Sequence, residues 1–221
     1  MTIPMNLFND TPMVTPRITT LRKIALFCAL PLMLSAAVML APLAAQAQSP
    51  ATSSTKVLIS TNLGAIEAEL YPDKAPKTVA NFVQYVNDKH YDGLIFHRVI
   101  PGFMLQGGGF DAQYKEKKTR APVAHEGRQA LAAGLKNTTG TLAMARTNDP
   151  QSATAQFFIN VVDNAFLDPS FQSFGYTVFG KVTSGMDVVQ KIRNTPTGAG
   201  GPFPTDVPRT PVVIQSITLL K

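Results

Sequence analysis

Hydrophobic residues follow two different periods in the region that begins near residue 56. Segments 56–61 and 65–70 suit the two strands of a hairpin, because the second segment alternates apolar and acidic residues after a turn at Asn62-Leu63-Gly64. Between residues 76 and 87 four apolar residues recur at helical spacing, and Pro76 suits the first turn of a helix. The pattern therefore predicts a β-hairpin followed by an amphipathic helix over 76–87.

The rest of the chain is richer in short apolar runs than in helical patterns. A second helix is expected from Met186 to Ile192, whereas 107–137 is a polar stretch that opens with three glycines and 195–208 is a loop rich in glycine and proline. The remaining strands are expected at 94–100, 103–106, 140–145, 156–161, 176–182 and 212–219. About eight strands, two helices and no internal repeat predict a mainly β fold, a closed eight-stranded antiparallel barrel capped by two α-helices.

The first 47 residues have the organisation of an export signal. Arg17, Arg22 and Lys23 precede an apolar or small-residue run over 24–43, and Ala45-Gln46-Ala47 fits the small-x-small rule of signal peptidase. We expect a signal peptide at 1–47 cleaved after Ala47, a linker at 48–55 and one domain at 56–221. The alternative is an uncleaved membrane anchor, because the run is close to the length that spans a bilayer.

Composition narrows the chemistry of the mature domain. The sole cysteine, Cys28, lies in the leader, so no disulfide or thiol chemistry is expected. Without the leader the chain has 17 cations against 13 anions, a mild charge of +4, and the basic segment 115–120 is interpreted as a solvated loop and not a nucleic-acid surface. The sequence has no H-E-x-x-H, G-x-S-x-G or phosphate-loop motif, so we expect no metal and no cofactor.

Arg98 is the most informative charged residue. It lies within the apolar, strand-like run 94–100, and the stretch 96–108 contains no carboxylate that could pair with it. A guanidinium beside apolar surface needs an acceptor for its hydrogen bonds. The partner is therefore elsewhere in the chain, as in a structural ion pair, or it is a substrate. Gln106 and Gln156 also lie beside aromatic residues, a composition that can bind and polarise a ligand but offers no nucleophile.

Four blocks resemble the signature sequences of the cyclophilins, which are peptidyl-prolyl cis-trans isomerases. They follow one another in the family's order, and the resemblance extends over nearly all of the chain from about residue 56 to residue 221. The blocks are Phe96 to Gly108, Gly140-Thr141-Leu142-Ala143-Met144-Ala145, Gln156-Phe157-Phe158-Ile159 and Val178-Phe179-Gly180-Lys181-Val182. The resemblance implies the same capped eight-stranded barrel that the hydrophobic pattern predicts.

The resemblance also implies a role for each matching residue. Arg98 matches the catalytic arginine of the family. The substrate-binding positions are Phe103, Met104, Phe158 and Leu167 for the proline ring, Gln106 and Gln156 for the polar rim, and Ala145 and Arg146 for the residues before the proline. Taken alone, the phenylalanines could be core residues and Gln156 could satisfy the barrel backbone. Phe157 and His97 are interpreted as structural.

Two further binding positions depart from the family pattern. Phe166 stands where the family often has a tryptophan, and Tyr176 stands where it commonly has a histidine, while 169–175 is an insertion. These departures resemble the bacterial periplasmic branch. Because the tryptophan contributes to cyclosporin binding in the family, weak cyclosporin binding is expected here.

The resemblance therefore implies an isomerase that rotates X-Pro peptide bonds. Its partners would be proline-containing unfolded or partly folded polypeptides, and it would act as a periplasmic monomer that assists the folding of exported proteins, without nucleic acid or a membrane. The alternative is a proline-peptide-binding chaperone module that uses the same groove without essential turnover. An assay of an Arg98 variant separates the two hypotheses.

Overall fold

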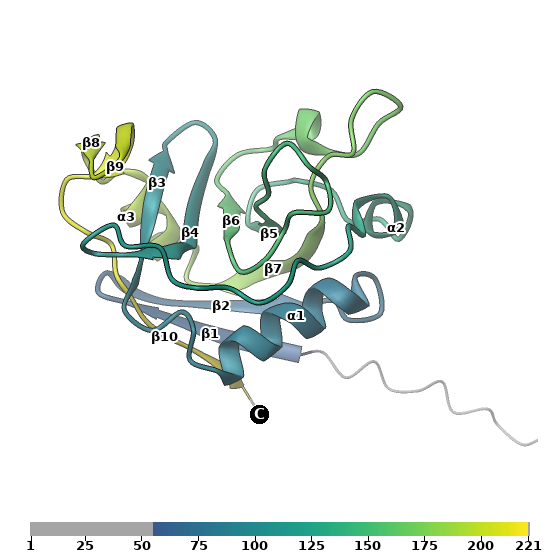
Figure 1. Ribbon diagram of the computed structural model, residues 1–221, viewed down its shortest axis with the longest axis horizontal. Helices are drawn as coiled ribbons and strands as arrows, with labels where there is room; N and C mark the ends of the chain where they lie inside the picture. Colours follow the sequence, from purple (N-terminus) through teal and green to yellow (C-terminus); the bar gives the residue numbers. More distant parts are fainter. Residues whose placement is uncertain (1–54, 221) are drawn as a thin grey trace, which may run out of the picture. The chain divides into compact units, whose positions relative to one another are not determined.

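The computed structural model describes residues 55–220 (Figure 1). The expected signal peptide and nearly all of the expected linker lie outside the described residues. Within the described range, no helix combines the length and the apolar character needed to cross a bilayer.

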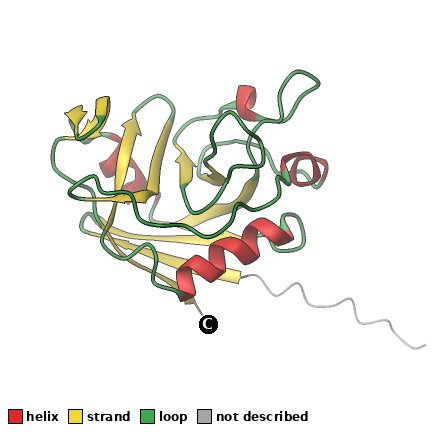
Figure 2. Cartoon of the chain, in the orientation of Figure 1, coloured by secondary structure: helices red, strands yellow, loops and turns green. Residues whose placement is uncertain are grey.

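One curled antiparallel sheet forms the framework of the domain (Figure 2). Its eight strands are hydrogen-bonded in the order β10-β1-β2-β7-β5-β6-β4-β3. In chain order these strands are β1 (Thr55–Thr61), β2 (Gly64–Leu70), β3 (Leu94–Ile100), β4 (Met104–Asp111), β5 (Thr141–Met144), β6 (Phe157–Asn160), β7 (Val178–Ser184) and β10 (Ile214–Leu220). Two further strands, β8 (Thr197–Gly200) and β9 (Phe203–Pro208), form a separate two-stranded sheet. The predicted eight-stranded antiparallel architecture is confirmed.

The sheet is curled into a barrel-like form, but it does not close fully. Its end strands β3 and β10 are connected only by an isolated bridge between Ile95 and Val213 and by neighbouring backbone hydrogen bonds, such as the one that Phe96 N donates to Val212 O over 2.9 Å. Pro208 and Pro211, which precede β10, have no N–H to donate to a continuous ladder. The expectation of a closed barrel is therefore wrong in this detail.

Helix α1 (Pro76–Asn87) lies against the sheet and begins and ends at the predicted residues (Figure 1). Its Phe82 is fully buried in an aromatic cluster, with ring centroids 5.1 Å from Phe179 and 5.5 Å from Phe157. Phe157 is thereby confirmed as a core residue. Helix α1 stabilises the core mainly by burying the apolar surface of such rings.

The number of helices and the loop at 195–208 differ from the prediction. Besides α1 and the predicted α3 (Met186–Arg193), the structure contains α2 (Gly127–Ala132) and a short 3-10 helix, η1 (Ala165–Leu167). The segment expected to be a loop is the separate hairpin β8-β9, which packs against β3. Glycine and proline weaken the apolar alternation from which strands are recognised, so this hairpin has no strand pattern in the sequence.

Candidate active site

Arg98 lies on the β3-β4 hairpin, directly opposite Gln106. The register of the two strands shifts between Phe96 and Arg98, so that His97 is an extra residue on β3. Because of this bulge, Phe96 and Val99 are both buried in the main core, whereas the Arg98 side chain is 44% exposed. A bulge of this kind redirects a side chain, and here it turns the guanidinium out of the core.

Nine predicted site residues surround one small cavity. The cavity has a volume of ≈ 120 Å³, the liquid volume of roughly four water molecules. Its lining consists of Arg98, Phe103, Met104, Gln106, Ala145, Arg146, Phe158, Leu167 and Tyr176. Apolar groups on one side therefore face a guanidinium and an amide on the other, in a space that fits one small ring and no large cofactor.

The apolar wall of this cavity belongs to a second hydrophobic cluster, separate from the main core. Met104, Phe158 and Leu167 are buried there together with Ala143 and Val178, and Phe103 packs against them while remaining half-exposed. Strands β4 and β6 bring two of these residues close together, because Gln106 pairs with Phe158 and Met104 with Asn160. The wall is thus held by paired strands.

A buried network of side-chain amides holds the loops that carry Phe103 and Leu167. Asn164 Nδ2 donates to Phe103 O over 2.9 Å and to Asn160 Oδ1 over 2.7 Å, while Asn160 Nδ2 donates to Thr141 Oγ1 over 2.9 Å. Asn160 and Asn164 are almost fully buried, so these bonds are costly to lose. Neither residue is among the site residues predicted from the sequence. The one available signal was the polar Asn160 within the apolar run 157–162.

Gln156 does not line the small cavity, but it is hydrogen-bonded to Gln106, which does. Gln106 Nε2 donates to Gln156 Oε1 over 3.0 Å. Gln156 lines an adjoining hollow of ≈ 490 Å³, and Gln106, Ala145 and Arg146 line both spaces. The two spaces therefore form neighbouring parts of one groove, a geometry that suits an extended chain with one side chain in the small cavity.

Ionisable groups near the groove offer little proton-transfer chemistry. Within residues 55–220 no group accepts a hydrogen bond from the Arg98 guanidinium, and the carboxylate closest to it is that of Asp206, with Oδ2 3.9 Å from Nε. Burial lowers the pKa of His97 to about 4, and the neighbouring Arg98 charge acts in the same direction. His97 is therefore neutral near pH 7. No cluster of three His, Cys, Asp or Glu side chains in the described part of the chain is placed to hold a metal.

Comparison with known proteins identifies the family. A family model described as cyclophilin type peptidyl-prolyl cis-trans isomerase/CLD matches residues 56–219. The chain belongs to this enzyme family. It is 54% identical over 171 residues to peptidyl-prolyl cis-trans isomerase A of Dickeya dadantii, a match that covers 77% of this chain and 87% of the relative. It is 52% identical over 166 residues to peptidyl-prolyl cis-trans isomerase B of Escherichia coli, covering 74% of this chain and 98% of the relative.

Solved cyclophilin structures share the fold. A cyclophilin-type isomerase of Cryptosporidium parvum aligns with a TM-score of 0.59 at 24% identity, over 76% of this chain and 98% of that one. A second structure of that protein, solved in the presence of the dipeptide Ala-Pro, aligns with a TM-score of 0.58 at 25% identity, over 75% of this chain and 99% of that one. The expected family, the isomerase activity and the mainly β fold are thus confirmed.

In this cyclophilin-type domain, the two positions that depart from the family pattern lie beside the cavity. Phe166, on η1, is 72% exposed and its ring stacks on Phe103 with centroids 5.6 Å apart. Tyr176 meets Phe158 edge to face at 5.5 Å, and the Arg146 guanidinium lies 4.6 Å from the centre of the Tyr176 ring. Arg146 also donates from Nε and Nη2 to Gly175 O, which fixes its side chain at the rim.

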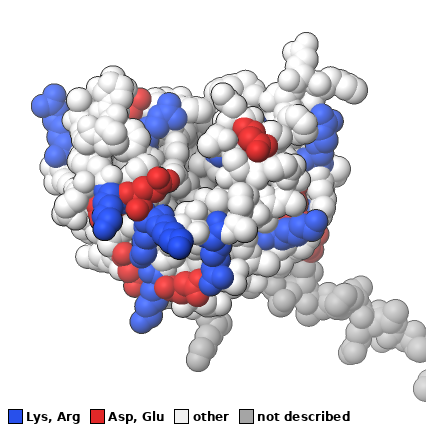
Figure 3. Space-filling view, in the orientation of Figure 1, with Lys and Arg blue, Asp and Glu red and all other residues white. Residues whose placement is uncertain are grey.

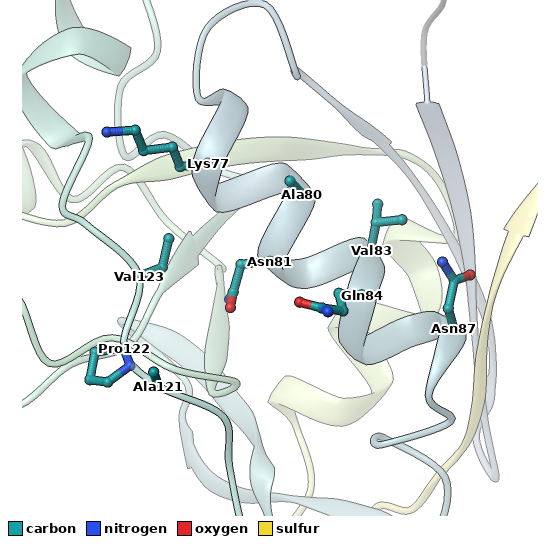
Figure 4. Close-up of a pocket in the computed structure, with 9 residues that line it drawn as sticks. All are labelled: Lys77, Ala80, Asn81, Val83, Gln84, Asn87, Ala121, Pro122 and Val123. Carbon is teal, nitrogen blue, oxygen red and sulfur yellow. The ribbon is translucent and has the colours of Figure 1, made fainter.

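A wider hollow lies apart from the cyclophilin groove, between α1 and the segment Ala121 to Val123 (Figure 4). Asn81 and Gln84 point from the helix toward that segment, and Asn81 Nδ2 donates to Thr154 O over 2.7 Å. The one charged residue that lines this hollow is Lys77. The face that Figure 3 shows mixes basic and acidic side chains, and the basic segment 115–120 contributes an ion pair between Arg120 and Asp88.

Proposed function

We propose that Arg98 is the catalytic residue of this isomerase and that the ≈ 120 Å³ cavity receives the proline ring of the substrate. The observation that carries the proposal is the position of Arg98 at the rim of a ring-sized apolar cavity, with its guanidinium free of hydrogen-bond acceptors among residues 55–220. A donor placed in this way is available to a substrate.

The proposed mechanism is non-covalent. Amide resonance gives the X-Pro bond a barrier of about 20 kcal/mol, and rotation removes this resonance and leaves a lone pair on the prolyl nitrogen. The guanidinium can donate a hydrogen bond to that lone pair, which the planar cis and trans forms do not offer. An interaction that exists only in the twisted state lowers the barrier.

The remaining site residues bind and align the substrate. Phe103, Met104, Phe158 and Leu167 would hold the proline ring while the other side of the amide rotates. The substrate residues before the proline would lie along Ala145 and Arg146 toward the ≈ 490 Å³ hollow, with Gln106 and Gln156 at its polar rim. The structure of the Cryptosporidium parvum relative with Ala-Pro supports a ligand of this class.

The physiological substrates would be proline-containing segments of unfolded or partly folded exported proteins. This part of the proposal is supported by the sequence features of residues 1–47, which are typical of a cleavable export signal and favour a bacterial periplasm as the location of the mature enzyme. We propose a monomer. Weak cyclosporin binding is proposed because Phe166 lacks the indole N–H that a tryptophan would supply at this position.

A chaperone-like binding module is the second candidate, and three exposed rings favour it. Phe166, Phe171 and Phe174 are 72%, 103% and 52% exposed. Phe166 stacks on the cavity residue Phe103, and the other two lie in the segment between the cavity residues Leu167 and Tyr176. Exposed apolar residues beside a groove can hold an unfolded chain without turning it over.

Replacement of Arg98 separates the two candidates. We expect Arg98→Ala to reduce kcat/KM in a protease-coupled proline-peptide assay by about 100-fold or more, the usual effect of losing one transition-state donor. Arg98→Lys should recover little, because an ammonium lacks the planar fork of the guanidinium. An unchanged rate in a folded Arg98→Ala enzyme would refute the catalytic role.

A further inference from the structure

Asp206 is the one described carboxylate that lies within ion-pair distance of Arg98. Its Oδ2 is 3.9 Å from Arg98 Nε, and the two side chains are 35% and 44% exposed. The two residues are 108 positions apart, so their proximity follows from the fold and not from the local sequence. Thr205 Oγ1 donates to the same Oδ2 over 3.1 Å, which helps to fix the carboxylate.

The β8-β9 hairpin delivers Asp206 to this position (Figure 1). Phe203, at the start of β9, stacks on His97 with ring centroids 5.3 Å apart and meets Phe110 edge to face at 5.1 Å. At the tip of the hairpin, Gly200 and Gly201 leave the space that the Tyr114 side chain occupies. A Cβ at Gly201 would collide with the Tyr114 ring, and a Cβ at Gly200 with its hydroxyl and with Val207. These contacts anchor the hairpin to β3 and β4.

The backbone of Asp206 has a conformation that ordinary residues avoid. Its φ is +67°, in the left-handed region, although the residue is not a glycine. Such a conformation costs free energy unless surrounding contacts impose it, and it is found preferentially at functional sites. Here it lies at the residue whose carboxylate faces the proposed catalytic guanidinium.

We propose that Asp206 is a positioning residue that orients the Arg98 guanidinium for catalysis. The inference rests on the proposed function of Arg98. The carboxylate faces Nε, which leaves both terminal nitrogens available to a substrate, and it restricts rotation of a side chain that no hydrogen bond within residues 55–220 fixes. Orienting a donor before the reaction removes part of the cost of aligning it in the transition state.

Asp206→Asn tests the proposal with little change of shape, because asparagine tolerates the left-handed region well. We expect kcat to fall by about two- to fivefold, the range of an exposed ion pair, with KM unchanged. Asp206→Glu should recover part of the loss, since it keeps the charge. The matched control is Asp187→Asn, which removes the same charge from an exposed carboxylate paired with Lys191 at 3.4 Å on α3, and should leave kcat unchanged.

Two further measurements separate positioning from a merely structural role. Raising the salt concentration should lower kcat of the wild type toward that of Asp206→Asn and leave the variant unchanged, because salt screens the pair. In an Arg98→Ala background, Asp206→Asn should cause no further loss, since residues that act through one another are not additive.

The outcomes also distinguish this inference from the proposed function. A wild-type rate in Arg98→Ala would overturn the proposed function and the inference together. An inactive Arg98→Ala with wild-type kcat in Asp206→Asn would overturn the inference alone. An increase of kcat in Asp206→Asn would also overturn it, because Asp206 would then compete with the substrate for Arg98.

Discussion

The two sides of Arg98 are built in different ways. On one side, an apolar wall of Met104, Phe158 and Leu167 is held by paired strands β4 and β6. On the other side, a hairpin of glycine, proline and one unusually placed aspartate is held against β3 by aromatic contacts. In the proposed function the wall would supply shape for a proline ring, whereas the hairpin would supply a charge for the guanidinium.

This difference shows why the two sides respond to different changes. Packing energy is spread over many contacts, so the wall tolerates a change of pH or salt but not the loss of a ring. The hairpin depends on a few contacts with His97 and Tyr114. Protonation of His97, or a methyl group added at Gly201, should therefore disturb it.

The largest effect is expected on the hairpin side at acid pH. The pKa of His97 is lowered from its ordinary value of 6.5 to about 4, mainly by burial. The unfolded chain therefore binds a proton more readily than the folded protein between these values. Stability is full above pH 6.5 and falls as the pH drops toward 4, by about 3 kcal/mol for this residue. The free energy of unfolding, measured by denaturant titration from pH 4 to 7, checks this.

His97→Phe keeps the aromatic contact with Phe203 and removes the titrating group. Its free energy of unfolding should depend less steeply on pH in that window than that of the wild type. Some dependence should remain, because burial also lowers the pKa of His90 and of His125. Equal slopes in the two proteins would show that His97 does not titrate as described.

The next effect concerns the apolar wall. Phe103→Ala should lower kcat/KM by about 10-fold, mostly through KM, because a bound proline ring would bury the exposed part of this half-exposed ring, and full burial of a phenylalanine contributes roughly 1.5–3 kcal/mol. The matched control is Phe171→Ala, which removes an equal ring that is fully exposed, at 103%, and should leave the rate unchanged. Peptide isomerisation rates over a range of substrate concentrations give the comparison. Equal losses in the two variants would contradict the assignment of the cavity.

A smaller effect is expected from one methyl group at the tip of the hairpin. Gly201→Ala should destabilise the protein by about 1 kcal/mol more than Gly134→Ala, since both glycines have positive φ but only Gly201 lies against the Tyr114 ring. Thermal unfolding measures the difference. Gly201→Ala should also reduce kcat as Asp206→Asn does, while Gly134→Ala should not. Identical behaviour of the two variants would mean that the hairpin does not position Asp206.

The sequence allowed much of the wall and little of the hairpin to be predicted. Regular alternation and helical spacing predicted the eight strands of the curled sheet and the exact bounds of α1. The family resemblance pointed to all nine residues that line the small cavity, although Arg146, Leu167 and Tyr176 lie outside the four blocks. Asp206 was missed because its ion pair joins distant parts of the chain. Asn160 and Asn164 were missed because a buried amide has no periodic pattern. The bulge at His97 could not be predicted either, because it depends on the register between two strands.

The most direct test of the catalytic role proposed for Arg98 is the rate of cis-trans exchange on the enzyme itself. Exchange NMR at saturating proline peptide measures this rate separately from binding. In Arg98→Ala, we expect the on-enzyme rate to fall by about 100-fold while peptide affinity changes by less than about fivefold, because the proposed hydrogen bond from the guanidinium forms only with the twisted amide. An on-enzyme rate equal to that of the wild type would contradict it.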